Sequence, residues 1–162
     1  MILMKKQIDN YLTPAGADKL REELKQLVEV QRVSLAERLR DAIRMGDLSE
    51  NADYIAAKED QAFLEGRILE LEATLRDATV IKGDAAGRNG LVGIGSKVTV
   101  VEDGSAAETY TVVGSAEADP RKGLISNQSP IGRALLGKRA GDTIKAKMPD
   151  GGTLSLKIDK VA

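Results

Sequence analysis

The chain has 162 residues, with 24 Lys and Arg against 25 Asp and Glu, so it is one domain or two small ones with almost no net charge. The absence of His and Cys excludes a zinc site, a thiol nucleophile, a Ser-His-Asp triad and a disulfide. No apolar run approaches the roughly 18 residues of a membrane span, and the first residues lack a signal-peptide pattern. A soluble cytoplasmic protein is therefore expected.

The first eighty residues are predicted to hold two long helices. Thr13 followed by Pro14 provides an N-cap and a first helical residue, and the helix then continues for about thirty residues until Gly46 stops it. Asp47 or Ser49 is expected to cap the second helix, which continues almost to the end of this region.

Both helices carry the alternating four-three spacing of a coiled-coil seam. Its positions are Leu20, Leu24, Leu27 and Gln31 on the first helix and Ala57, Gln61, Leu64, Ile68, Leu71, Leu75 and Ala78 on the second. Facing residues of a hairpin have position numbers with a constant sum, and Leu24 with Leu71 and Leu27 with Ile68 both sum to 95. Half of that sum falls between Asp47 and Leu48, so an antiparallel hairpin with its tip at about 46–54 is predicted.

Residues 96–162 are predicted to form a small antiparallel β-sheet domain, after a glycine-rich linker and domain entry at 81–95. The expected strands are Lys97–Val101, Thr109–Gly114, Gly123–Ser126, Thr143–Met148 and Thr153–Val161. Ser129 as a cap and Pro130 at the first helical position predict one short helix between them. The expected fold class is α+β, with residues 1–80 as the coiled-coil hairpin.

Two carboxylates mark the expected tip. Asp47 and Glu50 are three residues apart at a helix start, so both can point off the same end. One interpretation is structural, because acidic residues there cap the helix and complement its dipole. The other is metal binding, because Mg²⁺ favours one or two carboxylates together with waters and phosphates. In that case the remaining ligands come from another molecule.

Basic residues near the tip also allow two interpretations. Arg44 and Lys58 lie within about three helical turns of it. They can meet a phosphate backbone, or they can belong to an ordinary solvated face of the coiled coil.

The tip sequence Gly46–Tyr54, GDLSENADY, closely resembles the signature of the Gre transcript cleavage factors. The resemblance covers roughly residues 10–161 and is closer to the GreA type, because the tip is less basic than in the GreB type. The other segments that carry it are Leu12–Pro14, Leu20–Leu24, Ala56–Lys58, Ile125–Ser126, Ser129–Lys138 and Gly141–Asp142.

The resemblance implies an FKBP-like C-terminal domain, without prolyl isomerase activity, that binds bacterial RNA polymerase through Ser129 and Pro130. The hairpin is then expected to enter the secondary channel of the polymerase. There Asp47 and Glu50 would help to hold a second Mg²⁺, shared with the polymerase active site and not bound tightly by this chain alone. The polymerase itself would cleave the backtracked transcript, and this chain, as a monomer, would be an accessory factor rather than an enzyme.

The resemblance also assigns roles to the neighbours of the two acids. The residues implied to shape the tip or to touch the 3′ end of the nascent RNA are Ser49, Asn51, Tyr54, Arg44 and Lys58. One position departs from the family, which often has an Arg four residues before the first acid. Here that residue is Ile43, and Arg44 follows about 100° further around the helix.

Two other classes of function are compatible with a long hairpin. One is a non-catalytic regulator or inhibitor that binds the same polymerase channel, and the presence of both Asp47 and Glu50 argues against it. The other is a plain coiled-coil interaction module, which needs no particular tip sequence.

Overall fold

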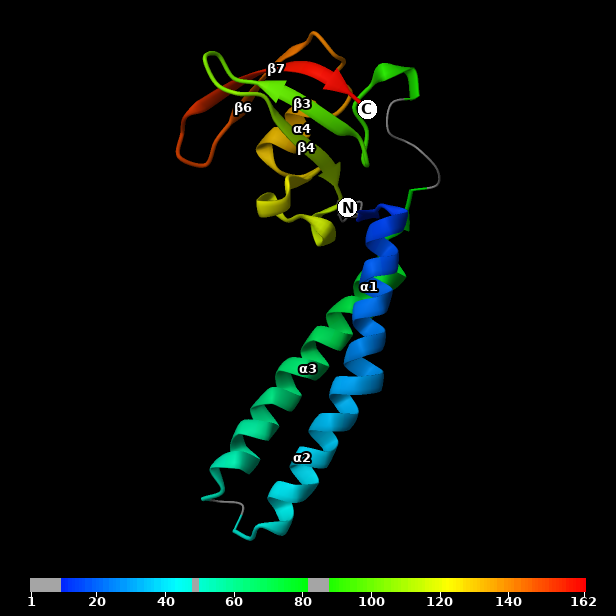
Figure 1. The fold of residues 1–162 in the computed structure, drawn as a ribbon, viewed down its shortest axis with the longest axis vertical. Helices are drawn as coiled ribbons and strands as arrows, with labels where there is room; N and C mark the ends of the chain where they lie inside the picture. Colours follow the sequence, from blue (N-terminus) through cyan, green and yellow to red (C-terminus); the bar gives the residue numbers. More distant parts are fainter. Residues whose placement is uncertain (1–9, 48–49, 82–87) are drawn as a thin grey trace, which may run out of the picture. The chain divides into compact units, whose positions relative to one another are not determined.

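In a computed structural model, the described residues are 10–47, 50–81 and 88–162 (Figure 1). They belong to two compact units, one formed by Ala17–Asp77 and the other by the residues up to Gly16 together with Ala78–Ala162. Within these described ranges, no helix is both long enough and apolar enough to cross a membrane.

The first unit is a helical hairpin. Its first arm consists of α1 (Pro14–Gln26), a five-residue π-helical turn η1 (Leu27–Gln31) and α2 (Arg32–Arg44). Its second arm is the single helix α3 (Ala52–Asp77), which lies alongside the first in the opposite direction (Figure 1). The predicted antiparallel hairpin is confirmed.

An apolar seam joins the two arms. Its large buried side chains, each at most 8% exposed, are Leu20, Leu27, Leu64, Ile68 and Leu71. Leu24 and Leu75 are only partly buried at its edge. These side chains belong to the predicted seam, so the heptad pattern identified the core of this unit.

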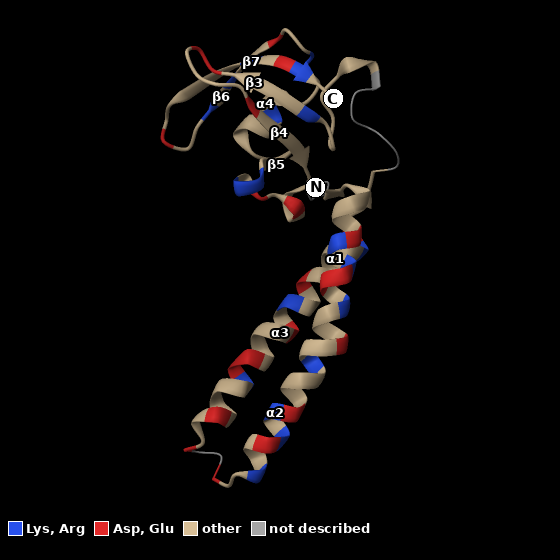
Figure 2. Ribbon diagram, in the orientation of Figure 1, with Lys and Arg blue, Asp and Glu red and all other residues tan. Residues whose placement is uncertain are grey.

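Ion pairs cross between the arms beside this seam. Arg32 pairs with Glu65 through two hydrogen bonds of 2.8 and 2.9 Å, and Arg67 reaches Glu23 at 2.8 Å. The position numbers of these pairs sum to 97 and 90, on either side of the predicted 95. Neither sum equals 95, so the facing of the individual leucines stays a prediction. Figure 2 shows residues of both charges along both arms.

The π-helical turn compensates for a one-residue shift in the heptad pattern. Beyond Gln31 the four-three rule places the seam at 34, 38 and 41, but the apolar residues stand at Leu35, Leu39 and Ala42. A π turn bonds residue i to i+5 and so adds one residue per turn, and the Arg32 N–H donates to the Leu27 carbonyl in this way. Leu39 and Ala42 are consequently buried. The prediction of Gln31 as a seam residue is wrong, because the turn leaves its side chain exposed.

The second unit is built on a five-stranded sheet with the order β5-β4-β3-β7-β6. The strands are β3 (Lys97–Val101), β4 (Glu108–Val113), β5 (Leu124–Ser126), β6 (Thr143–Lys147) and β7 (Thr153–Val161). The helix α4 (Pro130–Leu135) follows β5. The apolar core is formed by Val92, Val98, Val100, Val112, Ile125, Leu135, Ile144, Leu156 and Ile158.

The sheet is mixed rather than purely antiparallel. The pairs β3–β4, β3–β7 and β6–β7 are antiparallel, as predicted, but β4 and β5 run parallel. Two short 3₁₀ turns, η3 (Ser115–Glu117) and η4 (Pro120–Lys122), form the connection between them. This longer connection carries the chain back so that β5 starts at the same end as β4, which a two-residue hairpin does not allow.

The start of α1 is tied to the sheet unit. The strand β1 (Tyr11–Leu12) pairs in parallel with β2 (Thr79–Val80), and Leu12 is 1% exposed. Thr13 caps α1 as predicted, because the Gly16 N–H donates to its hydroxyl at 3.1 Å. The Thr13 N–H in turn donates to the Glu117 carboxylate at 2.8 Å. Residues 11–12 therefore form a short strand that directly precedes the helix.

The π turn generates a prediction about deletions. Removing Gln31 takes out the extra residue, so an unbroken α-helix then places Leu35, Leu39 and Ala42 on the seam. We expect the free energy of unfolding, measured by far-UV circular dichroism in urea, to change by no more than about 1 kcal/mol.

Deletion of Ala62 is the control, because this residue is also exposed but lies in the regular helix α3. It rotates Ala57 by about 100° relative to Leu64, so the two residues no longer lie on one face of α3. We expect the free energy of unfolding to fall by at least about 3 kcal/mol. Equal losses for the two deletions would contradict the proposed origin of the π turn.

Candidate functional site at the hairpin tip

The turn between α2 and α3 begins at a helix C-cap. The Met45 N–H donates to the Ala42 carbonyl at 3.2 Å, and Gly46 follows with φ at +116°. That backbone conformation favours glycine, so Gly46 ends the helix as predicted. Ser49 and the residue before it lie outside the described residues.

Asn51 is the N-cap of α3. It immediately precedes Ala52, and its side-chain Oδ1 accepts a hydrogen bond from the Tyr54 N–H at 3.1 Å. The predicted cap was Asp47 or Ser49. The prediction of Asp47 is wrong, because α3 starts later than the sequence suggested, and Ser49 lies outside the described residues. The capping position falls on Asn51, which is among the best residues for it.

The two candidate metal-binding acids both lie in this turn. Asp47 and Glu50 are exposed and belong to neither helix. Since Asn51 occupies the capping position, the structural interpretation of these acids as the cap of α3 loses its basis. Two exposed carboxylates suit a hard cation whose other ligands come from elsewhere. Among residues 10–47, 50–81 and 88–162, no three His, Cys, Asp or Glu side chains gather into a metal site.

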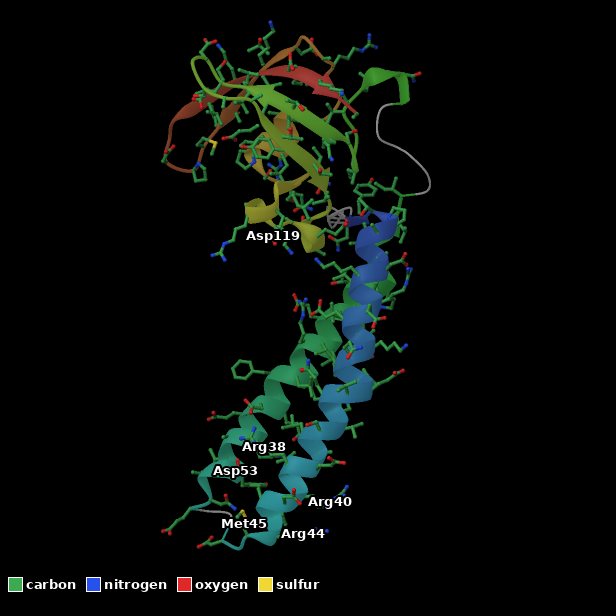
Figure 3. All side chains as sticks on the ribbon, viewed as in Figure 1. Arg38, Arg40, Arg44, Met45, Asp53 and Asp119 are labelled. Carbon is green, nitrogen blue, oxygen red and sulfur yellow. The ribbon has the colours of Figure 1, made fainter. Side chains whose placement is uncertain are left out.

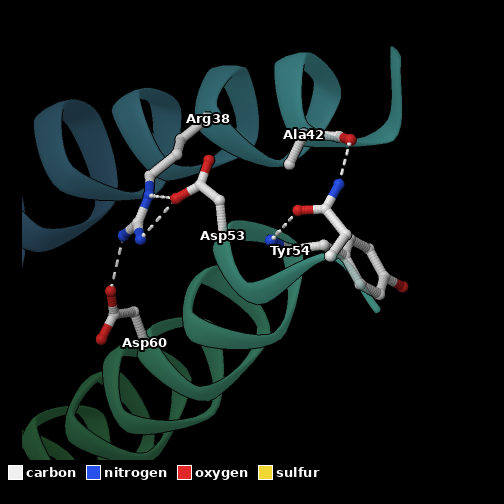
Figure 4. A network of polar contacts seen from close by, with 6 residues as sticks. Arg38, Ala42, Asp53, Tyr54 and Asp60 are labelled. Atoms are coloured by element: carbon white, nitrogen blue, oxygen red, sulfur yellow. Dashed lines mark hydrogen bonds and ion pairs between the residues drawn. The ribbon is translucent and has the colours of Figure 1, made fainter. Parts of the chain in front are cut away.

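Arg38 connects the arms just behind the turn. Its guanidinium pairs with Asp53 at 3.0 Å and with Asp60 at 2.7 Å, both on α3 (Figure 4). Hydrogen bonds to Asp60 and Asp53 raise the pKa of Arg38 above its ordinary value. The residue pattern alone does not distinguish Arg38 from the other arginines of the arm, but the one-residue shift of the seam is a usable signal, because it moves position 38 beside the core.

The other basic candidates lie on the surface. Arg44 is 73% exposed and approaches Asp41, one turn away on its own helix, at 4.0 Å. Lys58 donates to Gln61 at 3.0 Å. Figure 3 shows Arg38 between the arms, while Arg40 and Arg44 lie on the outer side of α2. Ile43, at the position that is often basic in the family, is 54% exposed.

The second candidate site lies in the sheet unit, at the start of α4. The Ser129 hydroxyl donates to the Ser126 carbonyl at 2.7 Å and accepts from the Gly132 N–H at 3.0 Å, so it caps the helix as predicted. Pro130 is exposed at the first helical position. A Cβ on Gly132 would come within 1.9 Å of the Ser126 carbonyl oxygen, so this tight loop requires glycine there.

A helical hairpin with an acidic turn, followed by a small mixed sheet with one short helix, defines the class of two-unit protein to which this chain belongs. Residues 10–80 match the family described as "Transcription elongation factor, N-terminal", and residues 87–162 match "Transcription elongation factor, GreA/GreB, C-term". The chain belongs to the GreA/GreB family of transcription elongation factors.

Relatives named "Transcription elongation factor GreA" are similar over almost the whole chain. The protein from Chloroflexus aurantiacus is 51% identical over 152 residues, which cover 93% of this chain and 96% of that protein. The protein from Bacillus licheniformis is 48% identical over 153 residues, which cover 93% and 95%. Among solved structures, the GreA factor homolog 1 (Gfh1) of Thermus thermophilus is 27% identical with a TM-score of 0.45, covering 95% of this chain and 99% of that one.

The Arg38 ion pairs generate a prediction about salt. Arg38→Met keeps the apolar stem but removes both contacts to α3, and the partners are 52% and 58% exposed. We expect a lower unfolding temperature than wild type at 0.01 M salt and at least a halving of that difference at 1 M, where the Debye length falls to about 3 Å.

Arg21→Met is the control, because Arg21 pairs with Asp18 on its own helix. Its effect should be smaller than that of Arg38→Met at low salt. An Arg38→Met defect that does not change with salt would show that packing of the stem, and not the ion pairs, joins the arms here.

Proposed function

We propose that this chain binds RNA polymerase, passes its hairpin into the secondary channel and brings Asp47 and Glu50 to the polymerase active site. There the polymerase cleaves backtracked RNA, and arrested complexes resume elongation. The observation that carries the proposal is the position of the two acids, exposed in the turn while Asn51 occupies the helix cap. Membership in a family of transcription elongation factors supports the choice of partner.

The chemistry assigned to the tip is coordination and orientation. Two carboxylates leave most of an octahedral coordination sphere for waters, RNA phosphate and groups of the polymerase. A second Mg²⁺ bound in this way would supply charge stabilisation to the attacking and leaving oxygens of the hydrolysis. Asp47 and Glu50 bind and orient, and the bond-breaking step belongs to the polymerase, so this chain is an accessory factor.

The loop at the start of α4 is the proposed contact with the polymerase. Ser129 fixes the loop through two hydrogen bonds, and Pro130 is left exposed on a turn that Gly132 keeps tight. A preorganised, exposed loop loses little conformational entropy when a partner binds it.

Charge-removing substitutions test the role of the acids. Asp47→Asn and Glu50→Gln keep the size of each side chain and leave the Asn51 cap in place, so the hairpin should keep its stability. Removing one metal contact worth about 2–4 kcal/mol in the transition state lowers a rate by roughly thirty- to thousandfold. We therefore expect single-turnover cleavage on a backtracked complex, at saturating factor, to fall at least about tenfold, with part of the Asp47→Asn loss recovered at higher Mg²⁺ concentration.

Binding of each variant to the polymerase is the control for this experiment, and it should equal that of wild type. Near-wild-type cleavage by both variants would overturn the catalytic role and favour a channel-binding regulator.

A substitution in the C-terminal loop tests the binding surface separately. Pro130→Ala should weaken polymerase affinity by roughly fivefold or more, the effect of losing a contact residue at about 1 kcal/mol. The cleavage rate at saturating factor should stay unchanged. Pro120→Ala is the matched control, because Pro120 is also exposed at the first position of a short helical turn in the same unit. Equal affinities for the two variants would remove Pro130 from the interface.

A further inference from the structure

Asn51 makes two hydrogen bonds that together span the turn at the tip. Its Nδ2 donates to the Ala42 carbonyl on α2 at 2.8 Å, and its Oδ1 accepts from the Tyr54 N–H on α3 at 3.1 Å (Figure 4). We propose that Asn51 is a positioning residue that holds the ends of α2 and α3 together and thereby fixes where Asp47 and Glu50 stand. This inference rests on the proposed function, because it concerns the same two acids.

The partners of Asn51 are backbone groups at helix ends, where the regular bonds between residues four apart are missing. The Ala42 carbonyl, in the last turn of α2, accepts from the Met45 N–H at 3.2 Å and takes the Asn51 amide as a second donor. Tyr54 lies in the first turn of α3, where N–H groups have no carbonyl four residues behind. One side chain therefore satisfies an end of each helix and closes the turn that carries both acids.

The two hydrogen bonds together are specific to asparagine. Capping needs an acceptor, which Asp and Ser also supply, but the contact to the Ala42 carbonyl needs a donor on the same short side chain. Asp has no donor, and a single Ser hydroxyl cannot occupy both ends of this bridge. A helix cap needs only the acceptor Oδ1, so the bond from Nδ2 to the Ala42 carbonyl is an additional role of Asn51.

The second connection between the arms near the tip differs in kind. The Arg38 ion pairs involve side chains that are 40–58% exposed, so salt screens them. The Asn51 bonds are neutral and partly buried, so salt affects them little. At physiological ionic strength the amide bridge is the connection that keeps the turn in one geometry. Misplacement of a catalytic group by about 1 Å can cost on the order of a hundredfold in rate.

The test compares Asn51→Ser with Asn51→Ala. Serine keeps the N-cap acceptor and loses the donor to Ala42, whereas alanine loses both. Ala52→Ser is the matched control, because it adds the same hydroxyl at the neighbouring exposed position and touches neither bond. For each full-length variant we would measure the single-turnover cleavage rate at saturating factor across a Mg²⁺ titration, polymerase affinity and thermal unfolding.

We expect Asn51→Ser to unfold at the wild-type temperature and to bind polymerase within twofold of wild type. Its cleavage rate should nevertheless fall at least about tenfold, with more Mg²⁺ needed for half-maximal rate. In the free protein, hydrogen exchange at the tip amides of Met45 and Ile55, which donate to the Ala42 and Asn51 carbonyls, should become faster, while exchange in the middle of α3 stays unchanged. Asn51→Ala should show the same cleavage defect together with lower helix stability, and Ala52→Ser should match wild type.

Two results would overturn the inference. If Asn51→Ser cleaves within twofold of wild type, Asn51 is only a helix cap. If the tip amides of Asn51→Ser exchange at wild-type rates, the bridge does not fix the turn. Failure of the proposed function is a separate outcome, because it appears as wild-type cleavage by Asp47→Asn and Glu50→Gln.

Discussion

Packing of one apolar stripe on each arm is the constraint on which the hairpin depends. Leu27, Ile68 and Leu71 are almost completely buried in it. Because each pair of facing residues fixes the next, the register set in the middle of the arms also determines which residues reach the turn. The same packing that stabilises the unit therefore places Asp47 and Glu50 at its end.

A second constraint on the turn is that the backbone polar groups at the two helix ends need hydrogen-bond partners. The turn must satisfy backbone carbonyls of α2 and N–H groups of α3 without covering the acids. The Asn51 amide and the Met45 N–H both donate to the Ala42 carbonyl, so this carbonyl has its partners within the turn. In the proposed function, Asn51 shapes the turn, and the exposed residues Asp47 and Glu50 are the part of it that meets a partner.

Local sequence signals predicted much of this fold. The leucine spacing identified the hairpin, and a Ser-Pro pair identified the start of α4. The parallel β4–β5 pair escaped prediction because pairing direction depends on how a longer connection folds. The cap of α3 was misplaced because Asp, Ser and Asn suit that position almost equally, so only the true helix start distinguishes Asn51 from Asp47. The π turn could have been predicted, since Leu35 and Leu39 each lie one position after the residue that the heptad spacing places on the seam.

The cross-arm ion pairs have a consequence for the charge of the hairpin as a whole. Within Ala17–Asp77 there are 10 Lys and Arg against 15 Asp and Glu, a net charge of −5, and several of the arginines are already committed to carboxylates. Ala78–Ala162 has 12 against 9, a net charge of +3. Nucleic-acid phosphates therefore repel the hairpin at long range. In the proposed function, the arm that acts beside the RNA has no electrostatic affinity for RNA elsewhere in the cell, so it is not sequestered by transcripts that need no cleavage.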